Sequence, residues 1–80
     1  MNRLKLSNIP LATFRRFLLS QGCILISTSG GHEKWHKDGC LRSIIIQTHQ
    51  DPVPEIVVRS NLRTLSLSRH DFEQWLLLDN

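Results

Sequence analysis

The sequence predicts an α+β fold in which helices pack on one face of a three-stranded antiparallel sheet. Two observations lead to this prediction. Apolar residues recur at helical spacing near both ends of the chain, and three short runs that are β-branched or alternate between apolar and polar residues lie between them. Turn-forming residues separate these runs, so that each run can pair with the next as a meander. The expected order of elements is α-β-β-β-α.

The first helix is expected over residues 11–21. Ser7 and Asn8 are residue types that cap helices, and Pro10 suits a first helical turn. Gly22 can end the helix, because glycine adopts the left-handed conformation that follows many helices. The apolar positions that recur at helical spacing are Leu11, Phe14, Phe17 and Leu18.

Three strands are expected over residues 23–28, 32–37 and 42–48. The residues Ser29-Gly30-Gly31 form the first turn. The second connection contains Asp38-Gly39, a pair typical of a two-residue hairpin. These connections predict antiparallel pairing between consecutive strands.

The C-terminal third is expected to return to helix after a proline-containing loop over residues 49–54. Residues 55–58 are ambiguous and can form an extended segment. Ser60 can cap a short helix over residues 61–65, and Ser68 to Asp71 has the spacing of a capping box that starts the last helix. That last helix is expected to direct Phe72, Trp75, Leu76 and Leu78 towards the core.

Length and composition limit the function. Residues 1–80 are expected to form a single domain, and a chain of 80 residues has little room for a deep cleft. The formal charge of +3 and the sequence pI near 9.4 favour RNA, DNA or an acidic protein as partner. No apolar run approaches a membrane span, and Cys23 and Cys40 are expected to be free thiols. These features predict a cytoplasmic protein.

His32 is the candidate catalytic residue. Cleavage of RNA needs a group that removes the proton of the ribose 2′-hydroxyl, and histidine suits this task because its ordinary pKa, about 6.5, lies near neutral pH. Gly30 and Gly31 have no side chains, so a phosphate can approach them and meet backbone N–H groups. His49 closes the third strand, and the meander should bring it to the same end of the sheet as His32. We therefore treat it as a second candidate catalytic residue.

Three cations are candidate RNA-binding residues. Lys34 shares strand parity with His32 and should emerge on the same face, whereas Lys37 should point with Trp35 unless the strand ends first. Arg42 belongs to a set of arginines that favour contact with phosphates rather than reading of bases. Lys34 can equally be a solvated residue on an exposed sheet face. The other arginines of that set are Arg15, Arg16, Arg59, Arg63 and Arg69.

A metal site is not expected. His32 and His36 share a face of one strand, but they should be about 13 Å apart at about 3.3 Å per residue. Zinc ligands lie only about 2.0–2.3 Å from the metal. We predict neither a metal nor another cofactor.

Four features in this order resemble the HicA (YcfA-like) family of toxin ribonucleases. They are the leading helix that ends at Gly22, the segment Gly30-Gly31-His32 followed by Trp35, the segment 46–49 that ends in His49, and the C-terminal signature over residues 62–72. The sequence departs from the family pattern at two sites: Gly31 replaces a serine or threonine, and Gln47 stands where proline is common. It is also shorter than the common pattern between Leu65 and Leu67.

The resemblance implies a fold like a double-stranded-RNA-binding domain, metal-independent cleavage of messenger RNA, and neutralisation by a HicB-type antitoxin. Two other functions remain open on the same fold: a non-catalytic RNA-binding module, and a basic domain that binds an acidic protein. The oligomeric state is also open, with a homodimer as one alternative.

Overall fold

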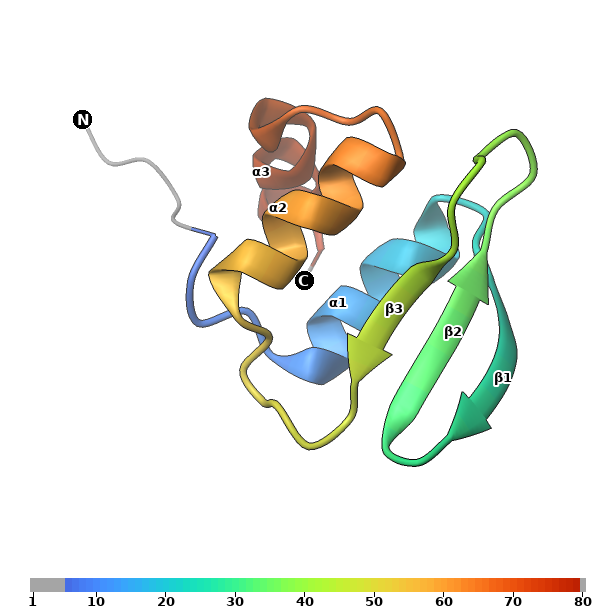
Figure 1. Ribbon diagram of the computed structural model, residues 1–80. Helices are drawn as coiled ribbons and strands as arrows, with labels where there is room; N and C mark the ends of the chain where they lie inside the picture. The colour runs from blue at the N-terminus through green and yellow to red at the C-terminus, as the bar shows by residue number, and fades with distance from the viewer. Residues whose placement is uncertain (1–5, 80) are drawn as a thin grey trace.

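The computed structural model describes residues 6–79 and has an α+β fold with three helices and one three-stranded antiparallel sheet (Figure 1). The chain order is α-β-β-β-α-α, which contains the predicted α-β-β-β-α order. The short helix that was expected over residues 61–65 is part of a longer helix, which precedes the last one. No helix among the described residues has both the length and the apolar character needed to cross a membrane. The elements are α1 (Leu11–Ser20), β1 (Ile24–Ser29), β2 (His32–His36), β3 (Ile44–Gln47), α2 (Glu55–Thr64) and α3 (Arg69–Leu78).

Helix α1 has the predicted buried side and a different N-terminal cap. Its four apolar positions at helical spacing are all buried. Pro10 occupies the N-cap position, and the backbone N–H of Leu11 donates to the carboxylate of Asp51 at 3.0 Å. The predicted caps Ser7 and Asn8 lie before this position, so that prediction is wrong. A side chain 40 positions away in the sequence supplies the acceptor instead.

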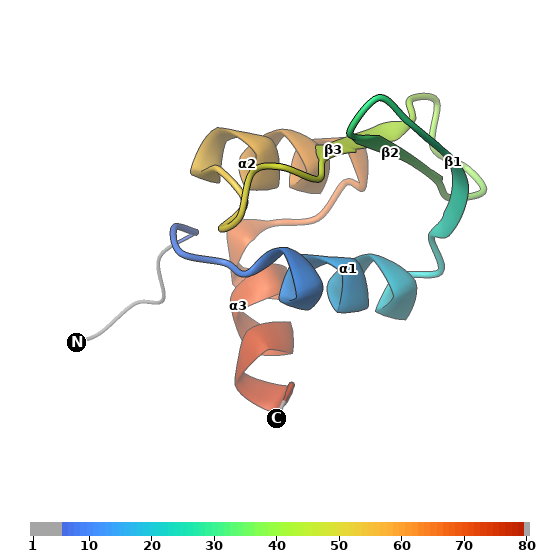
Figure 2. The same cartoon turned by 90° about the horizontal axis from the view of Figure 1, so that it is seen from below.

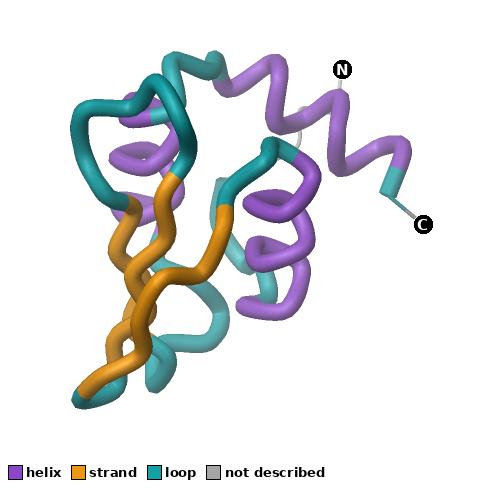
Figure 3. Tube along the Cα trace, turned by 90° about the vertical axis from the view of Figure 1, so that its right-hand side faces the viewer, coloured by secondary structure: helices purple, strands orange, loops and turns teal. Residues whose placement is uncertain are grey.

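The sheet has β2 in the centre, with β1 and β3 at its edges. Helix α1 lies on one side of the sheet, and no helix of residues 6–79 covers the opposite side, which we call the open face (Figure 2). Strand β2 alternates between these sides: Glu33 and Trp35 are buried towards α1, while His32 and Lys34 are exposed on the open face. Figure 3 views the sheet from the β1 side, where no helix stands in front of the strand.

The connection between β2 and β3 is longer than predicted. Strand β2 ends at His36 and β3 begins at Ile44, so residues 37–43 form a loop instead of a two-residue turn. The last pair between these strands is Trp35 with Ile44, and beyond it the chains separate. Asp38 and Gly39 lie inside this loop, and Lys37 falls outside the strand.

Helix α2 corrects the interpretation of residues 55–65. One helix follows Pro54 directly and includes both the segment read as extended and Ser60, which we had expected to be a cap. The buried residues of this helix are Val58, Asn61 and Leu62, a helical spacing that packs one side against the core. The helix lies alongside β3, beyond the edge of the sheet (Figure 2).

Helix α3 begins with the predicted capping box. The Asp71 N–H donates to Ser68 Oγ at 3.1 Å, and the Ser68 N–H donates to Asp71 Oδ2 at 2.8 Å. Phe72 is fully buried, and its ring lies edge-on to Phe17 with the centroids 4.7 Å apart. Leu78 is 85% exposed, so its predicted place in the core is wrong. The C-terminal end of the helix extends beyond α1 (Figure 2).

Candidate functional site

Two glycines make the tight turn that leads into β2. Gly30 and Gly31 have φ angles of 57° and 79°, and they join the paired residues Ser29 and His32. Positive φ at both central residues is the conformation that two-residue hairpins favour, and glycine adopts it at low cost. Both glycines are exposed, and neither N–H donates a hydrogen bond within the described part of the chain. The turn therefore presents two uncommitted backbone donors to a ligand.

The turn also orients the ring of His32. Nδ1 of His32 lies 3.1 Å from the carbonyl oxygen of Gly30, and the side chain is exposed. A carbonyl oxygen can only accept, so Nδ1 carries the proton in this contact. In the neutral ring, Nε2 then holds the lone pair, and it is this atom that can take a proton from a substrate.

His49 lies next to the same turn. A Cβ atom added to Gly31 would be 3.6 Å from Nδ1 of His49. The preceding residue holds this segment in place, because the N–H and the hydroxyl of Thr48 both donate to the carbonyl of Gly31, at 2.7 and 3.1 Å. The structure thus brings both candidate catalytic histidines to one end of the sheet, as the meander predicted.

Lys34 continues this surface along the open face. It pairs with Ser27 of β1 and Ile45 of β3, and all three residues are exposed. No carboxylate lies within ion-pairing distance of Lys34 among residues 6–79. Its ammonium group is therefore available to an anion bound near His32.

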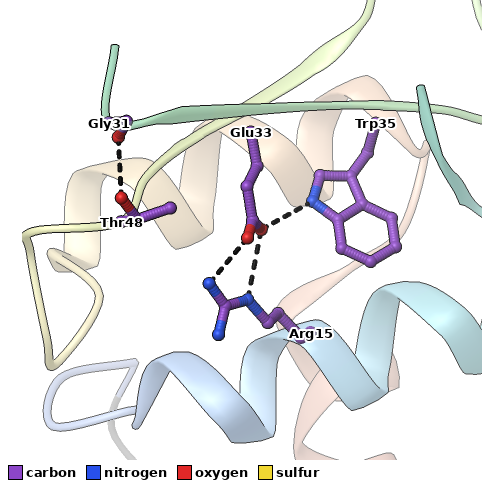
Figure 4. A network of polar contacts seen from close by, with 5 residues as sticks. All are labelled: Arg15, Gly31, Glu33, Trp35 and Thr48. Atoms are coloured by element: carbon purple, nitrogen blue, oxygen red, sulfur yellow. Dashed lines mark hydrogen bonds and ion pairs between the residues drawn. The ribbon is translucent and has the colours of Figure 1, made fainter. Parts of the chain in front are cut away.

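The other side of β2 is held by a partly buried polar network (Figure 4). The Arg15 guanidinium donates from Nε and Nη2 to the two carboxylate oxygens of Glu33, at 3.1 and 2.6 Å. The indole N–H of Trp35 donates to the same carboxylate at 3.1 Å. The hydrogen bond from Arg15 holds the pKa of Glu33 below its ordinary value, against the effect of burial. These contacts tie the strand that carries His32 to α1.

Most of the arginines that we considered for phosphate contact are paired with carboxylates. Arg15 binds Glu33, and Arg16 binds Asp79 at 3.0 Å. Arg59 and Arg69 pair with Glu55 and Glu73 one helical turn away. The cations outside any ion pair in the described region are Lys34, Lys37, Arg42 and Arg63.

Two of the predicted RNA-binding residues lie away from the glycine turn. Lys37 follows the end of β2 and Arg42 lies in the loop before β3, so both are at the opposite end of the sheet from Gly30 and His32. The structure therefore divides the predicted site residues into two groups. One group consists of Gly30, Gly31, His32 and His49. The second group consists of Lys37 and Arg42, and Lys34 lies between the two.

Metal ligands and thiols add little to this site. No three histidine, cysteine, aspartate or glutamate side chains of residues 6–79 are grouped so that they could hold a metal ion. Cys23 and Cys40 are both free, as predicted. Cys23 is buried, and burial raises the pKa of its thiol, so this sulfur is a core group rather than a nucleophile.

Comparison with known proteins leaves the site to be interpreted from its own geometry. No family model matches the chain, and neither the curated proteins nor the solved structures contain a match.

Two features of the site were not predicted from the sequence. Thr48 was given no role, although a hydroxyl one residue before His49 is a local signal for a backbone contact. Glu33 was not recognised as buried, although it shares strand parity with Trp35.

Proposed function

We propose that this protein is a metal-independent endoribonuclease of the HicA toxin type, with His32 as its general base. The observation that carries the proposal is the Nδ1 contact of His32 with the Gly30 carbonyl, which leaves Nε2 as the basic atom on an exposed ring. That ring stands beside two glycines whose N–H groups are uncommitted. A ribose hydroxyl and its phosphate can therefore reach the base and the donors together.

The proposed reaction uses the nucleophile that RNA itself supplies. Nε2 of His32 takes the proton of the 2′-hydroxyl, whose oxygen forms a bond to the adjacent phosphorus while the bond from phosphorus to the 5′-oxygen breaks. The products are a 2′,3′-cyclic phosphate and a 5′-hydroxyl, and the leaving oxygen receives its proton from His49 or from water. The N–H groups of Gly30 and Gly31, with the ammonium of Lys34, stabilise the negative charge that develops on the phosphate oxygens.

The proposal includes the fold comparison and the partner that the resemblance implies. A double-stranded-RNA-binding domain has the order helix, three-stranded meander, helix. In the proposed correspondence, α2 and α3 together take the place of its C-terminal helix. An antitoxin of the HicB type would inhibit by covering the open face at His32. We place the activity in the cytoplasm, where free thiols such as those of Cys23 and Cys40 persist.

The test compares His32→Ala with His36→Ala. Both residues lie on the open face of β2, but only His32 adjoins the glycine turn. With purified protein and labelled single-stranded RNA, His32→Ala should reduce cleavage by about 10²–10⁴-fold, the usual contribution of a general base. His36→Ala should cleave like the wild type, and both variants should still bind the RNA.

Two results would contradict this function. Binding of RNA by the wild type without cleavage would identify a non-catalytic RNA-binding module. Absence of salt-dependent RNA binding would refute both RNA functions and leave the domain that binds an acidic protein.

A further inference from the structure

The described surface contains a second basic region, at the opposite end of the sheet from His32. A groove of about 390 Å³ runs between β3 and α2. It adjoins a smaller hollow of about 270 Å³, because Arg42, Ser60 and Thr64 line both. The second hollow is completed by Arg63. Arg42 and Arg63, which form no ion pair with any residue of 6–79, thus line one depression.

The groove also contains polar groups that lack partners. Asn61 is 6% exposed and lines the groove, and its Nδ2 is buried without a hydrogen-bond partner. An unsatisfied buried donor is uncommon in native structures, because the hydrogen bonds to water that it loses are not replaced. The hydroxyl of Ser60 donates to no group in the described region. The Ser60 hydroxyl, like the two arginines, is a donor suited to an anion.

The groove is continuous with the surface that carries the proposed active site. Ile45 lines the groove, and across the strands it pairs with Lys34 on the open face. From the pair His32–Gln47 to the pair Trp35–Ile44 the sheet extends about 10 Å, at about 3.3 Å per residue. A chain bound at the glycine turn can therefore pass Lys34 and enter the groove.

We propose that the groove between β3 and α2 is a second RNA site, in which Arg42 and Arg63 bind backbone phosphates of the strand that is cut at His32. Guanidinium groups suit phosphate oxygens because they present several donors in one plane. The exposed side chains of Ile45 and Ile56 line the same groove and offer an apolar surface to the bases or riboses between those phosphates. This inference rests on the proposed function for the identity of its ligand.

The experiment compares two double variants that remove the same charge. Arg42→Gln with Arg63→Gln empties the groove of cations. Arg16→Gln with Arg59→Gln removes two exposed arginines that are already paired with Asp79 and Glu55 and that do not line the groove. Binding of a fluorescent single-stranded RNA is measured by anisotropy over a range of salt concentrations.

The groove variant should bind about 10-fold more weakly at low salt. The slope of log affinity against log salt should fall by about 1.4, since each phosphate contact with a single strand contributes about 0.7. The control variant should change affinity less than about twofold. Equal losses in the two variants would overturn the proposal, because they would show that total charge alone is responsible.

Cleavage separates this inference from the proposed function. A dinucleotide reaches only the glycine turn, so both double variants should cut it as the wild type does, whereas the groove variant should cut a longer RNA more slowly. If the longer RNA is cut equally well by all three proteins, the groove site is refuted and the ribonuclease stands. If groove-dependent binding occurs without any cleavage, the ribonuclease is refuted and the groove stands.

A third variant and a small anion complete the test. Ser60→Glu keeps both arginines and places a carboxylate in the groove, so it should weaken RNA binding in the same way. Inorganic phosphate is added alone and followed by NMR. The assignment to RNA would be overturned in favour of a small anion by two results together. Phosphate would shift only the NMR signals of groove residues, and none of the groove variants would change the affinity for RNA.

Discussion

Alternate residues of β2 form its two sides, and these sides differ in burial and in side-chain contacts. Glu33 and Trp35 are buried, hydrogen-bonded to each other and tied to α1 through Arg15. His32 and Lys34 are exposed and have no side-chain partner in the described region. The comparison teaches that strand parity separates the residues that hold the strand from those that can meet a ligand.

The largest expected effect on stability concerns the side of β2 that faces α1. Glu33→Ala removes the carboxylate that accepts from both Arg15 and the buried indole of Trp35. We expect a loss of about 2–3 kcal/mol in the free energy of unfolding. Loss of one partner of a buried ion pair costs about 3–5 kcal/mol, and the 37% exposure of the Arg15 side chain lets water recover part of that cost. Urea unfolding followed by circular dichroism measures the change.

Lys34→Ala is the matched control for this variant, because Lys34 is the next residue on the other side of the same strand. It should change stability by less than about 0.5 kcal/mol, as is usual for exposed positions. Equal destabilisation by the two variants would show that parity does not divide the strand as we propose.

Acid should weaken the same network. The hydrogen bond from Arg15 depresses the pKa of Glu33 in the folded state. A depressed carboxyl pKa stabilises the fold at pH values above the unfolded pKa, about 4.3, and this stability is lost as pH falls through the lower folded value. The stability difference between the wild type and Glu33→Gln should therefore be constant near neutral pH and should shrink below about pH 4. A difference that is unchanged down to pH 2 would show that the carboxylate charge does not contribute.

These tests also show where sequence patterns succeed. The helical spacing of apolar residues identified α1, and the residues Ser68 to Asp71 identified the start of α3, because both signals are local. The alternation around Trp35 placed His32 and Lys34 on one face correctly for the same reason. The turn at Gly30 and Gly31 was also recognisable, because only a few residue types tolerate two positive φ angles in succession.

The failures involve contacts between distant parts of the chain. Residues 55–58 contain the β-branched series Ile56, Val57 and Val58, which locally favours a strand, but burial of Val58 and Leu62 on one side stabilises a helix. Asp51 caps α1 from 40 positions away, which no local pattern can reveal. The third strand begins at Ile44 rather than at Arg42, because the Asp38-Gly39 signal predicted a shorter connection than the loop that forms.

The smallest expected effect concerns the glycine turn at the exposed end of the strand. Gly31→Ala places a side chain at φ 79°, a conformation that costs about 1 kcal/mol for a residue with a Cβ. The added methyl would lie 3.6 Å from Nδ1 of His49, which is ordinary contact, so His49 should stay in place. Under the proposed function, the methyl narrows the space between the turn and His49, so cleavage should fall a few-fold in addition.

Gly30→Ala separates these two consequences. Its φ of 57° carries a similar backbone cost, but no atom of the described residues lies within 4 Å of the Cβ that the substitution adds. Thermal unfolding should therefore show similar losses of stability for the two variants, whereas cleavage should fall further for Gly31→Ala. Equal cleavage by Gly30→Ala and Gly31→Ala would mean that RNA does not enter between the turn and His49. A substrate of His32 and His49 would then have to approach from the open face alone.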